Sequence, residues 1–290
     1  MTIQSILCIF GGSENELNAA NTALMLGKEY SAQVRFLHIS PDPSAYASMY
    51  GYGDCYATPA LLDACEKDNK ERLAKTRQYV AELTAKYHTQ LDSEGSPAHH
   101  TSAKLVHLTG RPDDIIAQEG RLSDLIITQR TTANALYDSS LIAALFNTGR
   151  PVILLPVQTI KAELGKYKTI AVAWKGTLDA ARAIYNAMPF LERAEKVIVL
   201  TAEGAGETYD LAAEAALLEY LHAHGIHAQG IVVAAGNLAA SDALLTRAKE
   251  LGADLLVMGA YGHTRFREMM LGGVTNDVLA AAEIPLLLSH

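Results

Sequence analysis

Cysteine is scarce in this sequence, and its three occurrences lie far apart. Cys8, Cys55 and Cys65 are too few and too scattered for a disulfide framework or a tetrahedral zinc site. Such usage is typical of a protein in a reducing compartment. The sequence therefore predicts no metal site and no disulfide-stabilised extracellular fold.

Long apolar runs and an excess of positive charge are also missing. No stretch approaches about 18 consecutive apolar residues, so we expect no transmembrane helix and no membrane partner. The N-terminus carries no basic segment, and the apolar run from Ile6 to Phe10 is too short for a signal sequence. The net charge of −8 argues against non-specific binding to nucleic acid or to an anionic membrane surface. We therefore expect a cytoplasmic protein.

The chain contains an internal repeat of about half its length. With 290 residues, 49% of them hydrophobic, it is long enough for two globular domains. Four landmarks recur in the same order, which indicates a duplication. The matched pairs are Ser5–Ser13 with Thr169–Thr177, Gly110–Gln118 with Gly236–Leu244, Ser123–Thr128 with Ala253–Met258, and Gly149–Pro156 with Glu283–Leu288.

Within each half, short apolar runs alternate with helical patterns of 12 or more residues. This alternation predicts an α/β fold: two tandem doubly wound parallel-sheet domains, residues 1–157 and 167–290, joined by a linker at 158–166. We expect the edge strands Val152–Leu155 and Pro285–Leu288 to be buried when the halves pack together. The expected strands are Ser5–Phe10, Val34–Ile39, Lys104–Leu108, Asp124–Thr128, Val152–Leu155, Thr169–Ala173, Lys196–Thr201, Gly230–Val233, Asp254–Met258 and Pro285–Leu288.

A glycine-rich stretch follows the fourth strand of the second half. The apolar run Leu255–Met258 ends in Gly259, Gly262 comes three residues later, and Gly272-Gly273 precede a helical pattern that begins at Val274-Thr275. Glycines at the end of a strand and the start of a helix let backbone amides approach a phosphate without a Cβ in the way. The stretch therefore predicts a nucleotide-phosphate site. The alternative is a loop whose glycines merely permit tight turns.

Strand, G-x2-G-x9-G and helix in this order resemble the ATP-binding signature of the universal stress protein family. The resemblance covers nearly the whole chain, as a tandem member with two Rossmann-like (adenine nucleotide alpha hydrolase-like) domains. It implies a stress-response regulator that binds ATP, ADP or AMP, with or without Mg²⁺, in its C-terminal domain. The residues that match the family's contacts are Gly259, Gly262, Gly272, Gly273, Val274 and Thr275, together with the backbone of Ala202.

The sequence departs from the family pattern at two positions. Gly273 replaces the usual Ser or Thr, so one hydroxyl contact to phosphate is lost while the amide remains. Lys175 stands where the family carries an Asp that contacts the adenine side, and a lysine accepts no hydrogen bond. We hypothesise that Lys175 instead reaches a phosphate. His263 and Arg265 lie in the loop, where they could meet phosphate charge or point to solvent.

The first half of the chain lacks the glycine motif of the second half. The stretch Thr128–Ser140 contains no glycine, so we interpret the first domain as degenerate for nucleotide binding. Ser139-Ser140 opens a helix and is better explained as an N-cap than as an anion site. An insertion at residues 41–66 carries four tyrosines and follows the second strand. It is either a lid or partner surface, or a long loop that packs on its own helices.

No nucleophile–base pair or metal-ligand spacing stands out, so we predict no catalytic or metal-binding residues. His222, His224 and His227 surround Gly225, which marks a helix end. We expect binding rather than catalysis, with at most weak ATP hydrolysis. The alternatives are a non-nucleotide module for an unknown protein partner and a slow ATPase. The halves are expected to form an internal pseudo-dimer, and the chain a homo-oligomer.

Overall fold

The structure is a computed structural model. It describes residues 2–42, 59–92, 102–130, 138–157, 166–203, 210–234, 239–260 and 274–290. The chain divides into two compact units. The N-terminal unit consists of Ile3–Gln129 and Ser139–Arg150, and the C-terminal unit of Pro151–His290 with short additional pieces that include Arg130.

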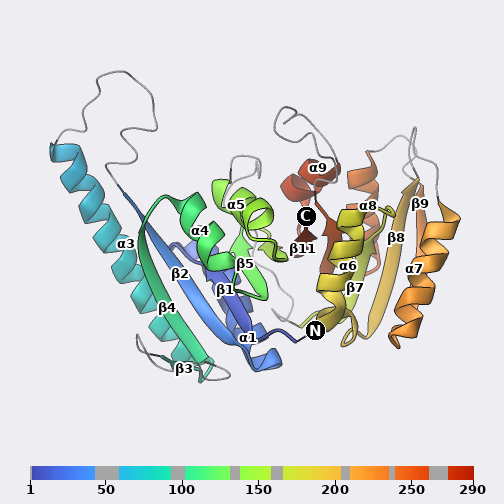
Figure 1. The fold of residues 1–290 in the computed structure, drawn as a ribbon, viewed down its shortest axis with the longest axis horizontal. Helices are drawn as coiled ribbons and strands as arrows, with labels where there is room; N and C mark the ends of the chain where they lie inside the picture. Colours follow the sequence, from blue (N-terminus) through green and yellow to red (C-terminus); the bar gives the residue numbers. More distant parts are fainter. Residues whose placement is uncertain are drawn as a thin grey trace, which may run out of the picture. The chain divides into compact units, whose positions relative to one another are not determined.

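The N-terminal unit has a parallel sheet in the order β3-β4-β2-β1-β5. Helices α1 and α3 cover one face of this sheet, and α4 and α5 the other (Figure 1). Its elements are β1 (Ser5–Ile9), the short 3-10 helix η1 (Glu14–Glu16), α1 (Leu17–Tyr30), β2 (Gln33–Pro41), α3 (Pro59–Lys86), β3 (Gln90–Leu91), β4 (Ser102–Gly110), α4 (Pro112–Gly120), β5 (Leu125–Gln129) and α5 (Ser139–Asn147).

The C-terminal unit has the strand order β6-β11-β10-β7-β8-β9. All neighbours are parallel except β6, which runs antiparallel to β11. Helices α6 and α7 cover one face, and α8 and α9 the other (Figure 1). The elements are β6 (Val152–Leu155), β7 (Thr169–Ala173), α6 (Leu178–Leu191), β8 (Lys196–Glu203), α7 (Leu211–Ala223), β9 (Ala228–Ala234), α8 (Ala240–Glu250), β10 (Leu255–Gly259), α9 (Val274–Ala281) and β11 (Leu286–Ser289).

This architecture confirms the predicted fold class of two tandem doubly wound α/β domains. The central strands are buried on both faces: Leu255, Leu256 and Val257 of β10 are each 0% exposed. Such strands read as continuous apolar runs, which is why the sequence located them well. The units also repeat their hydrogen bonds. The Asp124 carboxylate accepts from the backbone of Gln4 and Ser5, and that of Asp254 from Lys168 and Thr169.

The packing of the chain does not follow the halves of its sequence. Strand β6 precedes the predicted boundary at residue 157, yet it pairs with β11 and belongs to the C-terminal unit. The pairing unites the two strands that the sequence singled out as buried edges. The predicted domain limits stay a prediction, and the linker, of which 158–165 lie outside the described residues, is not tested. Of the insertion 41–66, residues 59–66 form the start of α3.

Candidate functional site

The candidate site lies at the carboxyl ends of β7 and β10, in the middle of the C-terminal sheet. From β7 the chain adds β8 and then β9 on one side, while β10 and β11 lie on the other. Ligands of open α/β sheets bind where the strand order reverses in this way. The loops that leave β7 and β10 therefore start side by side at the expected position for a ligand.

The loop after β7 is held by its neighbours on β8 and α7. The backbone N–H of Trp174 donates to the carbonyl of Leu200, and its indole Nε1 donates to the carbonyl of Ala213 at 3.1 Å. Gly176 adopts a positive φ of 70°, and the Thr177 hydroxyl accepts from the backbone of α6 as its N-cap. Lys175 lies between these fixed residues with an exposed side chain.

Gly259 ends β10 directly beneath the first turn of α6. A Cβ at this position would lie 2.6 Å from the backbone nitrogen of Ala180 and 2.7 Å from the carbonyl carbon of Asp179. Both distances are far shorter than van der Waals contact. The glycine is therefore required for close packing of helix on strand, whatever else it contacts. From the sequence we expected this glycine either to let a phosphate approach or to permit a tight turn, and did not anticipate the packing role.

The other predicted contacts within the described residues lie on β8 and α9. Ala202 is near the end of β8, where its register partner is Val233 on β9. Val274 and Thr275 are the first two residues of α9, and Val274 is 36% exposed. The N-terminal amides of a helix point outward and carry positive partial charge. Helix α9 thus begins where the motif predicts the start of a helix.

The remaining predicted contacts lie outside the described residues. These are Gly262, His263, Arg265, Gly272 and Gly273. The proposed roles of these five residues stay predictions.

A buried carboxylate near the site escaped the sequence reading. Glu214 on α7 is 7% exposed, and it accepts a hydrogen bond of 2.8 Å from the Thr201 hydroxyl on β8. The side chain occupies the space above Gly230 on β9, where a Cβ would lie 2.9 Å from Cδ of Glu214. An acidic residue inside an Ala/Leu-rich helix was the only available signal. Its hydrogen bond to Thr201 was not visible in the sequence.

In the N-terminal unit, the loop after β1 corresponds to the loop after β7. Its backbone amides bind a side chain of the same unit. The Glu16 carboxylate accepts from the backbone N–H of Gly11 at 2.9 Å and of Ser13 at 3.1 Å, so an internal acid takes the amides that an anion would use. At the position matching Gly259 stands Gln129, which is 1% exposed. The interpretation of this half as degenerate for nucleotide binding stays a prediction.

Within the described ranges, no group of three or more His, Cys, Asp or Glu side chains is placed to hold a metal ion. In the same part of the chain, no helix is both long and apolar enough to cross a membrane. His222, His224 and His227 are exposed around the C-terminal end of α7, as their spacing predicted.

The strand order and the helices on both faces of each sheet define a doubly wound α/β protein. The model of the universal stress protein family matches residues 166–290. Residues 166–290 are therefore similar to a universal stress protein domain. This finding confirms the family that the glycine motif resembles.

The chain is also similar to individual proteins and solved structures. A universal stress protein of Mycobacterium tuberculosis is 29% identical over 144 residues, which cover 44% of this chain and 99% of the relative. A universal stress protein from Archaeoglobus fulgidus has the same fold over 99% of this chain and 96% of its own, with a TM-score of 0.69 and 15% identity. A universal stress protein solved in complex with cAMP is 24% identical and covers 43% of this chain and 98% of its own, with a TM-score of 0.36.

Proposed function

We propose that the C-terminal half binds one adenine nucleotide (ATP, ADP or AMP, with or without Mg²⁺) and that the protein regulates a stress response through it. The observation that carries the proposal is the position of the motif. Strand β10 ends at Gly259, helix α9 begins at Val274, and β7 lies beside β10 where the strand order reverses. A strand–glycine loop–helix unit at this point is the usual architecture for holding phosphates.

The phosphates would be bound by backbone amides between Gly259 and Thr275, with help from the helix dipole. The Thr275 hydroxyl adds a side-chain donor in the first turn of α9. Lys175 supplies an exposed cation from the neighbouring loop. The backbone of Ala202, one strand away, would contact the adenine. These are groups that bind and orient a ligand, so we expect binding with at most slow hydrolysis.

A protein-interaction module without nucleotide is the second candidate. Lys175 in place of the family's Asp, and Gly273 in place of its Ser or Thr, favour this alternative because each removes a nucleotide contact. The two candidates differ in what the purified protein carries. The first test is to denature the protein and to chromatograph any adenine nucleotide that is released. About one equivalent per chain supports the nucleotide site, whereas none, together with no ATP binding by calorimetry, refutes it.

A matched pair of variants then locates the site. Thr275→Ala removes a hydroxyl from the first turn of α9, and Ser139→Ala removes one from the first turn of α5 in the other unit. We expect the first variant to weaken ATP binding about fivefold, the loss of one hydrogen bond, and the second to leave it unchanged. Equal effects would mean that the nucleotide is not bound at α9.

Lys175 needs its own test because the family usually carries an Asp at this position. Lys175→Ala is expected to weaken ATP binding more than AMP binding, since the ammonium would meet the outer phosphates. Lys175→Arg retains the charge and should restore most of the affinity. Unchanged affinity in Lys175→Ala would dispose of the phosphate role of this side chain.

A further inference from the structure

Arg130 connects the glycine-free loop of the first half to the last turn of α9. Its guanidinium Nη1 donates to the carbonyl of Leu279 at 2.5 Å and to that of Ala280 at 2.7 Å. Both carbonyls lie in the last three residues of α9, which ends at Ala281. Arg130 is only 6% exposed, so these bonds form away from solvent. A buried cation therefore satisfies the C-terminal carbonyls of this helix.

The place of Arg130 in the repeat makes this contact informative. Aligning Ser123–Thr128 with Ala253–Met258 matches Gln129 to Gly259 and Arg130 to Ala260. The backbone agrees: Arg130 N–H donates to the carbonyl of Leu155 at the end of β6, and Ala260 N–H to that of Ser289 at the end of β11. The position that follows the phosphate-site glycine in one half thus carries, in the other half, an arginine directed at α9.

Helix α9 has eight residues, so its two ends are only about 12 Å apart. The proposed nucleotide site places phosphate negative charge at its N-terminus, and Arg130 places positive charge at its C-terminus. Both charges are favourable to the helix dipole, and both favour the same position of the helix. Isolated helices of this length do not persist in water, so α9 depends on such tertiary contacts.

We infer that Arg130 is a positioning residue of the nucleotide site: the degenerate first half supplies the cation that holds the phosphate-binding helix of the second half. This inference rests on the proposed function. It gives the glycine-free stretch of the first half a role in the nucleotide site of the second half. It also means that the sequence of the family domain, residues 166–290, lacks a component of its own binding site.

The test uses the full-length protein and two arginine variants. Arg130→Met removes the charge and the donors but keeps most of the apolar volume, and Arg130→Lys keeps the charge. The control is Arg150→Met, because Arg150 also donates to a helix-terminal carbonyl, that of Arg121 after α4, at 2.8 and 3.0 Å. Calorimetry measures ATP and adenosine binding. Hydrogen–deuterium exchange follows the amides of residues 274–281.

We expect Arg130→Met to weaken ATP binding about tenfold, the value of a well-placed charge at a helix end, and to leave adenosine binding unchanged. Exchange should accelerate in α9 selectively. Arg130→Lys should recover part of both effects, and Arg150→Met should show neither. Loss of adenosine and ATP affinity to the same extent would identify a purely structural arginine and overturn the inference.

Unchanged ATP affinity in Arg130→Met, or unchanged exchange in α9, would also overturn it. If the unmodified protein binds no ATP, the proposed function fails and the inference fails with it. Exchange then still shows whether Arg130 holds α9, which distinguishes a wrong ligand from a wrong contact.

Discussion

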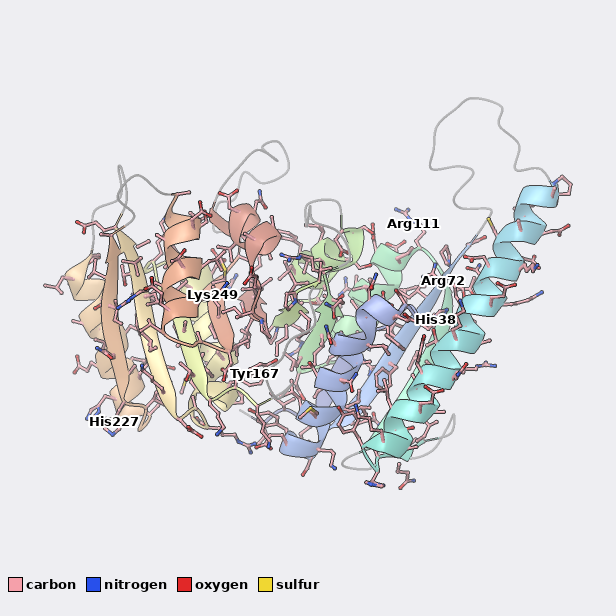
Figure 2. All side chains as sticks on the ribbon, turned by 180° about the vertical axis from the view of Figure 1, so that it is seen from behind. His38, Arg72, Arg111, Tyr167, His227 and Lys249 are labelled. Carbon is pink, nitrogen blue, oxygen red and sulfur yellow. The ribbon has the colours of Figure 1, made fainter. Side chains whose placement is uncertain are left out.

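The hydroxyl of Thr76 on α3 lies 2.8 Å from Nδ1 of His38 on β2. His38 is 1% exposed and Thr76 is 0% exposed, so this bond joins helix to sheet inside the N-terminal unit. Burial lowers the pKa of His38 to about 4, and positive charge on His107 of β4 and on Arg72 and Arg77 of α3 adds to the shift. Figure 2 labels Arg72 on α3 and His38 on β2, which lie close together.

The first prediction concerns the pH dependence of stability. Because the folded-state pKa of His38 is about 4 and its ordinary value is 6.5, the unfolded chain binds a proton that the folded chain excludes. The contribution is complete above pH 6.5 and is lost as the pH falls toward 4. The shift corresponds to about 3 kcal/mol of unfolding free energy. Urea unfolding at several pH values measures it.

His38→Gln should flatten this part of the pH profile. The matched comparison is His222→Gln, the same substitution at an exposed histidine at the end of α7. His107 contributes in the same direction, since burial and Arg77 lower its pKa as well. A profile as steep in His38→Gln as in the unmodified protein would contradict the assignment.

The second prediction follows from the packing of α6 on Gly259. Gly259→Ala places a Cβ 2.6 Å from a backbone nitrogen that cannot move independently of its helix. We expect a loss of about 3 kcal/mol in unfolding free energy. Gly149→Ala is the comparison: no atom lies within 4 Å of its Cβ, and only the φ of 69° costs about 1 kcal/mol. Chemical denaturation of both variants measures the difference.

If Gly259 served only a phosphate, its alanine variant would retain full stability and lose affinity alone. Substitutions of Gly259 therefore do not by themselves diagnose nucleotide binding.

The third prediction concerns the buried pair Thr201–Glu214. Thr201→Val removes the hydroxyl that donates to the carboxylate and should cost about 2 kcal/mol. Gly230→Ala forces the Glu214 side chain out of the same position and should break the same bond. The double variant should therefore be less destabilised than the sum of the two, by about 1 kcal/mol. Equilibrium unfolding of the four proteins gives this coupling energy.

Thr22→Val is a suitable reference for that cycle. The Thr22 hydroxyl is buried and has no hydrogen-bond partner among the described residues, so its removal should be nearly neutral. Strict additivity of Thr201→Val and Gly230→Ala would show that the carboxylate does not link the two positions.

Secondary structure was predictable where burial is complete. Strand β7 spans Thr169–Ala173, the range that the sequence predicted, because a strand covered on both faces must be apolar at every position. Strand β4 is longer than predicted, Ser102–Gly110 in place of Lys104–Leu108. It lies toward the edge of the sheet and is half-exposed along most of its length, so polar residues interrupt the apolar pattern. The two-residue strand β3 carries no periodicity and was missed.

The sequence by itself determined the duplicated α/β fold and the resemblance to the universal stress protein family, because these depend on local spacing and on runs of apolar residues. Only the tertiary structure decided which side chains of distant segments contact one another. The bond from Arg130 to Ala280 spans 150 residues, and that from Thr201 to Glu214 joins a strand to a helix. The pairing of β6 with β11 likewise ignores the boundary of the repeat. Such contacts arise from the packing of distant segments, for which a single sequence carries no periodic signal.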